Sequence, residues 1–501
     1  MANVKTNFTT FECTREVAGV IGTIPGSPVW RLLEPNTVST FGSKIDTVAR
    51  RPITKNRQAQ QGTIVDLDSK VDFEHDLTMD IVREFFPAFV MATEAGPFRY
   101  GPFETNTVVS TTTSTDVTTT PATAFALPIN TLILMRGFTN AANNGLKVLT
   151  AGSTTTVLKT TGLVTETPPT NAEVAVCGVQ GAAGDLSLDV SGNLNSAASI
   201  FVANMGLTVG QWIWVGGETA GTQFIDNTKR GWARITAITT AKLTLDKRSF
   251  AIGSDAGTAK TVQIFFGKFI RNVAVDSASF LERSYHFEAA WKDLISAGND
   301  GYEYAKGNYC DQLSFNLPLT SKSTVTLGFL GTDTDLPVAA GSRKTNASTP
   351  IAPVDKTAFN TSSDILRLRI TKIDETALTT YFKSATLKIN NNVNPEKVIG
   401  TLGAAFMNVG NLEVSLEAQV LFTNKDVVTS IRNNDRVTLE FSVRNGNGAI
   451  MTEIPSVSLG DGSKELTVDQ TVKVNLKGTA FEDPVLGTSI SFSTFPYAPA
   501  S

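Results

Sequence analysis

A strand-then-helix pattern occurs twice in this chain of 501 residues, and this repeat constrains the fold more than any other feature of the sequence. In the first copy, residues 63–86, apolar and polar side chains alternate up to Glu74, which predicts a half-buried strand. Apolar residues then recur at a spacing of four, which predicts an amphipathic helix directly after the strand. The helix is expected to carry Leu77, Ile81 and Phe85, with His75 or Asp76 as its N-cap and Asp80 in its first turn.

The second copy, residues 412–432, aligns with the first copy without a gap. Its helix is expected to begin at Thr423 or Asn424 as the cap. We interpret the two copies as an internal duplication. A duplication indicates that the chain contains two similar structural units. The aligned pairs are Val65 with Val414, Leu67 with Leu416, Val71 with Val420, Phe73 with Phe422, Val82 with Ile431 and Arg83 with Arg432.

Strand patterns around the two copies extend the duplication to larger units. The segments 277–291 and 313–331 have counterparts at 437–443 and 470–481. We therefore expect a mostly β fold, in which two β-sandwich or barrel units each carry a flanking helix and a further all-β region is inserted into the first unit. The first unit is expected at 12–98 and 272–340, the inserted region at 99–271, a linker at 341–356 and the second unit at 357–495.

The inserted region contains a second, weaker repeat. Residues 127–138 resemble residues 207–218, and a polar loop and two further short strand patterns follow each of them. This predicts two small β-domains. Their tryptophans are either part of a core or a weak carbohydrate-binding surface, because exposed indole faces stack on sugars. These tryptophans are Trp212, Trp214 and Trp232.

Composition argues against several classes of function. The net charge of -4 gives no basic surface for binding nucleic acid. Two histidines and three well-separated cysteines leave little material for a catalytic triad, a metal site or a disulfide framework, so we predict no catalytic residues, cofactor or metal. No apolar run approaches the roughly 18 residues of a membrane span. The N-terminal residues lack the apolar core of a signal peptide, so folding in a cytoplasm is expected.

Four segments of the chain carry a resemblance to a known family: TREVAGVIGTIPGSPVWRLL (14–33), VDFEHDLTMDIVREFF (71–86), DQLSFNLPL (311–319) and INNNVNPEKVIGTLGAAFMNVGNLEVSLEAQVLF (389–422). Together they resemble the tail tube proteins of long-tailed bacteriophages. The resemblance is strongest to the siphophage group that carries a fused second tube domain. It covers most of residues 12–98 and 272–495 and does not include 99–271.

The resemblance implies a structural virion protein. Its rings of six units would stack helically into a hollow tail tube that delivers double-stranded DNA without binding it specifically. Two units in one chain favour a homotrimer with a pseudo-sixfold ring over a homohexamer. Other tail proteins, namely the tape measure, tail tip and terminator proteins, would be further partners. The protein would assemble in the cytoplasm of the host bacterium and end in the virion tail.

The resemblance also suggests roles for particular residues. A long loop before each strand-helix copy, at residues 36–62 and 390–410, is expected to contact the next ring. The acidic row of each strand is a candidate wall of the lumen. The candidate lumen residues are Asp66, Asp68, Asp72, Glu74, Glu413 and Glu417, and the candidate inter-ring residues are Arg50, Arg51, Lys55, Arg57, Asn394 and Lys397.

Each of these residue patterns also has a plainer interpretation. An acidic row is typical of any solvated strand face, and a basic cluster of any solvated loop. A different function is that of a virion decoration or adhesion protein that binds a host-surface glycan through residues 99–271. Tube formation distinguishes these functions, because an adhesin stays a discrete oligomer. The acidic pairs are not accompanied by a base, a nucleophile and an oxyanion site, so an enzyme is not expected.

Overall fold

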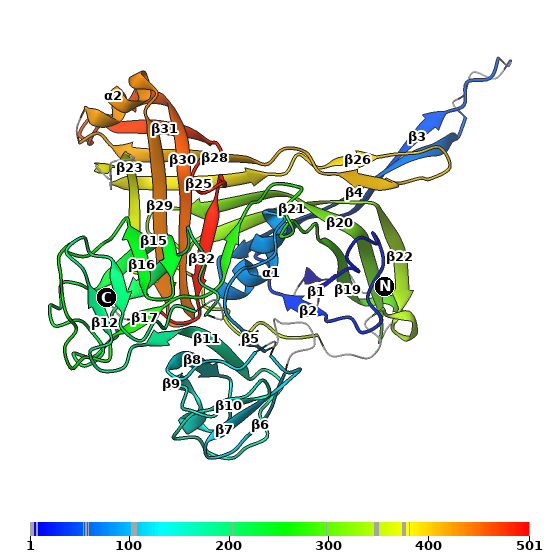
Figure 1. Ribbon diagram of the computed structural model, residues 1–501. Coiled ribbons are helices and arrows are strands. Elements are labelled where there is room, and N and C mark those ends of the chain that lie inside the picture. Colours follow the sequence, from blue (N-terminus) through cyan, green and yellow to red (C-terminus); the bar gives the residue numbers. More distant parts are fainter. Residues whose placement is uncertain are drawn as a thin grey trace. The chain divides into compact units, whose positions relative to one another are not determined.

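The chain divides into two units, and each is assembled from segments far apart in sequence. Antiparallel strands dominate both units, so the predicted mostly β fold is confirmed (Figure 1). Unit 1 contains Met1–Met91, Phe280–Ala358 and Ser384–Ala418, and unit 2 contains Ala92–Ser279, Phe359–Lys383 and Gln419–Ser501. The computed structural model describes residues 5, 6, 9–53, 55, 58, 60–101, 108–123, 125–202, 205–296, 298–344, 350–372, 377–379, 381–423 and 425–499.

The main sheet of unit 1 contains five antiparallel strands in the order β3, β4, β21, β20 and β25. Residues that face each other across these strands are apolar on one face and polar on the other, as the alternation of the sequence requires. The bounds are β3 (Thr37–Ala49), β4 (Gly62–Asp76), β20 (Asn299–Leu317), β21 (Thr324–Gly331) and β25 (Phe382–Asn390), of which residues 384–390 belong to unit 1.

A second group of strands in unit 1 is built on the first part of the long strand β20. This part pairs with β19 and β22, and β1 continues the sheet from β19 to β2. A small hairpin of β26 and β27 follows later in the chain. The bounds are β1 (Thr10–Arg15), β2 (Arg31–Leu33), β19 (Ser284–Ser296), β22 (Asp333–Ala339), β26 (Asn394–Glu396), β27 (Phe406–Asn408) and β28 (Glu413–Leu421), of which residues 413–418 belong to unit 1.

An aromatic core joins these strands to helix α1 (Met79–Phe89). The Phe73 ring, on β4, lies 5.4 Å from the ring of Phe11, 6.0 Å from Phe85, 6.0 Å from Phe287 and 5.9 Å from Phe329. All five rings are buried. Because edge-to-face and offset aromatic pairs stabilise beyond the area they bury, this cluster is the main packing element of unit 1.

The predicted N-cap of α1 is wrong. The cap is Thr78, whose hydroxyl accepts a hydrogen bond from the backbone of Ile81. His75 and Asp76 still belong to β4, where they pair with β21, so the strand continues beyond the point expected from the sequence. Asp80 lies in the first turn as predicted. All residues of α1 are buried, and the helix is therefore a core element rather than a surface cover.

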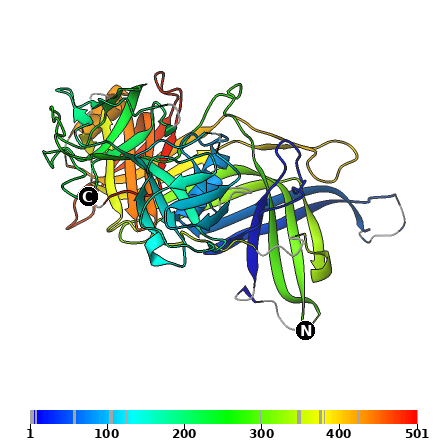
Figure 2. The same ribbon diagram turned by 60° about the horizontal axis from the view of Figure 1, so that its bottom comes forward.

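The loop predicted at residues 36–62 is wrong for residues 37–49, which form β3. This strand is exposed along most of its length, so its sequence lacks the alternation that a buried face imposes. It pairs with β4 from Thr37 opposite Glu74 to Ala49 opposite Gly62. The two strands form a long hairpin, seen in Figure 1 and again in blue in Figure 2. Burial alternates in β4 only from Leu67 onward, and Val65 is exposed, so the first residues of the predicted half-buried strand have no buried face.

Unit 2 contains a C-terminal sheet in the order β24, β23, β29, β30 and β31. Strand β32 also pairs with β30, and β18 pairs with β32. The bounds are β18 (Phe269–Arg271), β23 (Ile365–Lys372), β24 (Ala377–Thr379), β29 (Arg436–Asn445), β30 (Gly448–Glu465), β31 (Lys473–Ala480) and β32 (Ser491–Phe495).

Helix α2 (Asp426–Asn433) follows β28, as predicted, but its predicted cap is wrong. The N-cap is Lys425, which makes no side-chain capping bond; of the two expected caps, Asn424 lies outside the described residues. The helix ends at Asn433, and the left-handed conformation of its C-cap Asn434 (φ 54°) suits asparagine. Two residues of the helix, Val427 and Ser430, are buried, so α2 is a surface helix, unlike α1.

The remaining strands of unit 2 belong to the segment between α1 and β18. Nine of them form one sheet in the order β12, β13, β16, β15, β14, β17, β11, β8 and β9, with β5 against β11, and β6, β7 and β10 form a smaller sheet. The bounds are β5 (Arg99–Tyr100), β6 (Val108–Thr112), β7 (Asp116–Thr120), β8 (Thr131–Arg136), β9 (Gly145–Val148), β10 (Val157–Lys159), β11 (Glu173–Gln180), β12 (Leu186–Leu188), β13 (Leu194–Ser196), β14 (Trp212–Val215), β15 (Gly231–Thr239), β16 (Lys242–Asp246) and β17 (Gln263–Phe265).

The two units share one strand order. Strands β1, β19, β20 and β21 are consecutive neighbours in unit 1, and β23, β29, β30 and β31 are consecutive neighbours in unit 2. The strand before each helix also has an equivalent place. Strand β4 pairs with β21, and Phe422, just after β28, donates a backbone hydrogen bond of 2.9 Å to Val472, just before β31. The boundaries of the two expected domains remain a prediction.

Candidate functional site

The polar face of the main sheet in unit 1 carries most of the candidate lumen residues. Three rows of residues lie directly opposite one another across β4, β21, β20 and β25 on this face. Because paired residues of an antiparallel sheet share a face, the polar side chains form one continuous surface. The rows are Asp76–Thr324–Asn316–Thr386, Glu74–Thr326–Ser314–Lys388 and Asp72–Gly328–Gln312–Asn390.

Lysine side chains neutralise part of the acidic charge on the polar face. Asp72 pairs with Lys70 at 2.9 Å, and Glu417 on β28 pairs with Lys388 at 3.1 Å. Glu413 is exposed at the start of β28. The surface is therefore a mixture of both charges, in which Lys70 belongs to the polar row of β4 itself and Lys388 is added by β25.

The candidates Asp66 and Asp68 lie farther along β4, where a third candidate contacts them. The ammonium group of Lys397 lies 2.5 Å from a carboxylate oxygen of each residue. The hydrogen bond from Lys397 lowers the pKa of Asp66. Asp46 on β3 lies opposite Asp66, and the carboxylate oxygens of Asp46, Asp66 and Asp68 lie within 4.8 Å of one another. Lys397, together with Lys44, which lies 3.2 Å from Asp46, thus supplies positive charge for this acidic group from within the same unit.

Two projecting segments of unit 1 meet at these ion pairs. The first arm is the β3–β4 hairpin from residue 37 to 68, and the second arm is residues 394–408, which contain β26 and β27. Lys397 belongs to the second arm and binds the first, so the structure joins a predicted inter-ring residue to two predicted lumen residues.

The other predicted inter-ring residues lie on the same arms. Arg50, Arg51 and Lys55 are exposed in the connection between β3 and β4. Arg57 lies outside the described residues. Asn394 is exposed on β26, where its amide donates a hydrogen bond of 3.2 Å to Glu396. The described basic residues therefore lie at the end of the first arm, and Asn394 lies on the second arm.

Sequence reasoning missed the apolar side chains that both arms expose. Single exposed apolar residues are common on protein surfaces, but a group on two adjacent projections indicates a contact surface. In the sequence, these side chains were recognisable as apolar residues that follow neither the period of two of a half-buried strand nor the spacing of four of an amphipathic helix. The exposed residues are Val38, Ile45, Val48, Ile53, Ile64 and Val65 on the first arm and Val398, Ile399, Leu402 and Phe406 on the second.

The tryptophans of the inserted region are all buried. Trp212, Trp214 and Trp232 belong to one cluster with Phe265 and Phe495. The Trp232 ring lies 4.9 Å from the Phe495 ring. Of the two interpretations of these tryptophans, the structure supports the core, and none of the three offers an exposed indole face to a sugar.

The comparison with protein families gives one match. The family model described as phage tail tube protein matches residues 11–480, which is nearly the whole chain. The chain therefore belongs to the phage tail tube protein family, as the resemblance implied. No curated protein matches it.

Membership of this family defines the general role of the chain. It is a structural component of a phage tail that assembles with itself and with other tail proteins. The family is one of structural rather than catalytic proteins. Of the helices in the described parts of the chain, none has the length and apolar character needed to cross a membrane.

Proposed function

We propose that this protein forms rings that stack helically into the hollow tail tube, and that double-stranded DNA passes through the lumen during delivery. The observation that carries this proposal is the polar face of unit 1, because its three rows contain no apolar side chain across four strands. A sheet with one apolar face in the core and one polar face suits the wall of an aqueous channel.

The charges on the polar face suit a channel that does not retain DNA. Lysine and arginine contacts to phosphates provide most of the non-specific affinity for DNA. Lys70, Lys388 and Lys397 each pair with a carboxylate of the same unit. Their charge is therefore already compensated, and the lumen candidates Glu74 and Glu413 add further negative charge to the surface. DNA would meet little net attraction.

Ring closure follows from the free edge of the sheet. Strand β3 is 13 residues long, and among the described strands it pairs with β4 alone. A long exposed edge of this kind favours pairing with another chain. Head-to-tail contacts close into a ring when the rotation between neighbours allows it. Since the two units share one strand order, three chains would complete a ring of six units, and we propose a homotrimer rather than a homohexamer.

Ring stacking would use the two arms. Arg50, Arg51 and Lys55 are exposed on the first arm, and both arms expose apolar side chains around them. Charged residues at the rim of a contact fix its register, and the apolar residues provide the affinity. Lys397 would hold the second arm on the first, so that both present one surface to the next ring.

The proposal retains the domain division expected from the sequence. The first tube domain comprises residues 12–98 and 272–340, the linker 341–356 and the second tube domain 357–495, with 99–271 inserted as two small β-domains. Tape measure, tail tip and terminator proteins would bind the ends or the lumen of the tube, and assembly would occur in the host cytoplasm. An adhesion function for the insertion has no supporting observation, because its tryptophans are buried.

Electron microscopy of the concentrated, purified protein tests the proposal. We expect hollow tubes, or rings with six lobes that contain three chains by native mass spectrometry. Six chains in such a ring would refute the homotrimer but would still agree with a tail tube. A discrete oligomer that binds host cells and never forms rings or tubes would refute the proposed function in favour of the adhesion protein.

A further inference from the structure

Two glutamates of the C-terminal sheet are buried on the face that residues 92–279 cover. Glu440 on β29 lies directly opposite Glu453 on β30, and Arg369 on β23 lies opposite Glu440 in the same row. Both glutamate side chains are 0% exposed. An ionised carboxylate in a protein interior is costly unless hydrogen bonds and opposite charges compensate it, and two adjacent carboxylates repel each other as well.

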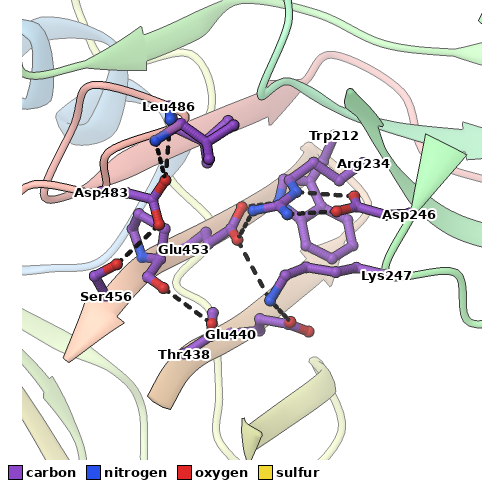
Figure 3. A network of polar contacts seen from close by, with 12 residues as sticks. Trp212, Arg234, Asp246, Lys247, Thr438, Glu440, Glu453, Ser456, Asp483 and Leu486 are labelled. Atoms are coloured by element: carbon purple, nitrogen blue, oxygen red, sulfur yellow. Dashed lines mark hydrogen bonds and ion pairs between the residues drawn. The ribbon is translucent and has the colours of Figure 1, made fainter. Parts of the chain in front are cut away.

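Among the described residues, all polar partners of Glu453 come from the segment between α1 and β18. The Arg234 guanidinium lies 2.5 Å from one carboxylate oxygen, and the indole nitrogen of Trp212 donates a hydrogen bond of 2.7 Å to the other (Figure 3). The Lys247 ammonium lies 3.7 Å from the first oxygen. Asp246 holds Arg234 in place through two hydrogen bonds, of 2.9 and 2.5 Å. Without this segment, Glu453 would lose each of these contacts.

Glu440 has partners on both sides. Within the C-terminal sheet it pairs with Arg367 at 2.7 Å and with Arg369 at 2.9 Å. From residues 92–279, the Lys247 ammonium lies 2.8 Å from its other carboxylate oxygen. Lys247 therefore bridges the two glutamates (Figure 3). The sheet alone compensates one of its two buried carboxylates, and residues 92–279 must supply the charge for the other.

Apolar residues pack against part of this network, and Arg234, Asp246 and Lys247 also line a cavity of about 230 Å³. Trp212 lies beside the network, and Trp232 and Phe265 pack in the same cluster as Met451 and Phe495 of the C-terminal sheet. The backbone of Trp212 also donates a hydrogen bond of 3.0 Å to the Ser493 hydroxyl on β32. The two carboxylates themselves are 0% exposed, so removal of a cation that pairs with them costs more than at a surface.

Unit 1 meets the same need with a short segment. Glu12, Glu288 and Tyr304 form a row across β1, β19 and β20, at the place that Arg369, Glu440 and Glu453 occupy in the strand order of unit 2. Glu288 is 0% exposed, and Arg343 from the segment after β22 compensates it at 2.5 Å and reaches Glu12 at 3.0 Å. Each sheet thus buries a glutamate on its second strand and receives a cation from a covering segment.

We propose that residues 92–279 act as a clamp on the C-terminal sheet, in which Arg234 and Lys247 supply the charge that allows Glu440 and Glu453 to be buried. The clamp and the sheet then fold as one cooperative unit. This segment is not a separable appendage, and opening it would open β29 and β30 as well. The proposal concerns contacts within unit 2 and does not depend on tube formation.

Hydrogen exchange of the full-length Arg234→Met/Lys247→Met variant tests the clamp. We expect amide protection in β29 and β30 to fall at least about tenfold, together with a red shift of the tryptophan emission, because the buried indoles become hydrated. The matched control is Lys242→Met on β16, whose ammonium pairs with Asp189 at 2.9 Å and does not contact the C-terminal sheet. This control should keep the protection of the unchanged protein.

A second pair of variants tests the clamp if Arg234→Met/Lys247→Met does not fold. Arg234→Met alone leaves Glu453 without its closest cation, and Arg234→Met/Glu453→Met removes the buried charge as well. We expect the second change to restore protection in β29 and β30. Equal loss of amide protection in Arg234→Met and in Arg234→Met/Glu453→Met would refute the proposed clamp. So would an opening of residues 92–279 in which β29 and β30 keep the protection of the unchanged protein.

Discussion

Glu440 and Glu453 face each other across β29 and β30 with neither carboxylate exposed to solvent. Like charges directly opposite in a sheet are destabilising, so this pair requires fixed cations. Arg367 and Arg369 belong to the sheet, whereas Arg234 and Lys247 come from residues 92–279. The stability of the C-terminal sheet is therefore tied to Arg234 and Lys247, which lie 219 and 193 positions from Glu453 and Glu440 in sequence.

Double-mutant cycles on Arg234 and Glu453 should show strong coupling. Arg234→Met alone leaves the buried Glu453 carboxylate without its closest cation and should cost about 3–5 kcal/mol of the free energy of unfolding. The double variant Arg234→Met/Glu453→Met should cost less than the sum of the two single changes, with a coupling of about 1–3 kcal/mol. Urea denaturation measures all four proteins. The partly exposed pair of Lys242 and Asp189 is the matched control and should couple by less than about 1 kcal/mol. Equal coupling in both pairs would contradict the prediction.

The aromatic core of unit 1 should depend strongly on Phe73. Phe73→Ala removes the ring that contacts four other buried rings and should lower the free energy of unfolding by about 3–5 kcal/mol. Phe406→Ala is the control, because this ring is 61% exposed on the second arm and should cost less than about 0.5 kcal/mol. Denaturation of the dissociated protein gives both values. Similar losses for the two variants would show that Phe73 is not a core residue.

Stability should rise as the pH falls from neutral toward 5. Burial raises the pKa of Glu12 to about 7 from an ordinary value of 4.5, and burial together with Asp355 raises the pKa of Asp80 to about 6 from 3.8. The folded chain therefore binds these protons at a higher pH than the unfolded chain does, so protonation favours folding. Urea denaturation between pH 8 and 5 measures the rise. In Glu12→Gln the rise should be smaller, and a wild-type protein that loses stability over this range would contradict the prediction.

Below pH 4.5 the trend should reverse because of Glu84 on α1. Burial alone would raise its pKa, but Arg15 and Arg31 lower it to about 2 from an ordinary value of 4.5. The ionised Glu84 carboxylate therefore stabilises the folded state by about 3 kcal/mol above pH 4.5. This contribution is lost as the pH falls toward 2. The free energy of unfolding should therefore pass through a maximum at about pH 5. In Glu84→Gln the decrease at acid pH should be smaller, although the variant is less stable at neutral pH.

Charge on the exposed arms should impair polymerisation and leave folding intact. Ile399→Asp on the second arm and Arg50→Glu/Arg51→Glu on the first should each raise the concentration needed for tube formation at least about tenfold, which corresponds to about 1.4 kcal/mol per contact. Ile399 is fully exposed, so the free energy of unfolding should change by less than about 0.5 kcal/mol. Sedimentation and electron microscopy measure the polymer.

A matched surface change controls for charge alone. Val190→Asp lies in the inserted region, outside both arms, at a side chain that is also well exposed. This variant should polymerise at the concentration of the unchanged protein. If Val190→Asp and Ile399→Asp impaired tube formation equally, the arms would not be the contact surface between rings.

The strand-then-helix repeat was readable from the sequence because one face of each strand is buried. In β4 the buried residues from Leu67 to Phe73 alternate with polar ones, and the helix that follows repeats every four residues. The same reasoning failed for β3, whose residues are exposed on both faces and therefore carry no period. It also misplaced the cap of α1, because pairing with β21 extends β4 to Asp76.

The sequence by itself determined the duplicated strand-helix elements, the mostly β class and the acidic rows, because these depend on local periodicity and residue type. Only the tertiary structure decided which charges meet. Lys397 compensates Asp66 and Asp68 across 329–331 positions, and Arg234 compensates Glu453 across 219. Such pairs arise from the register and packing of distant strands, and local periodicity carries no information about which distant strands pack together.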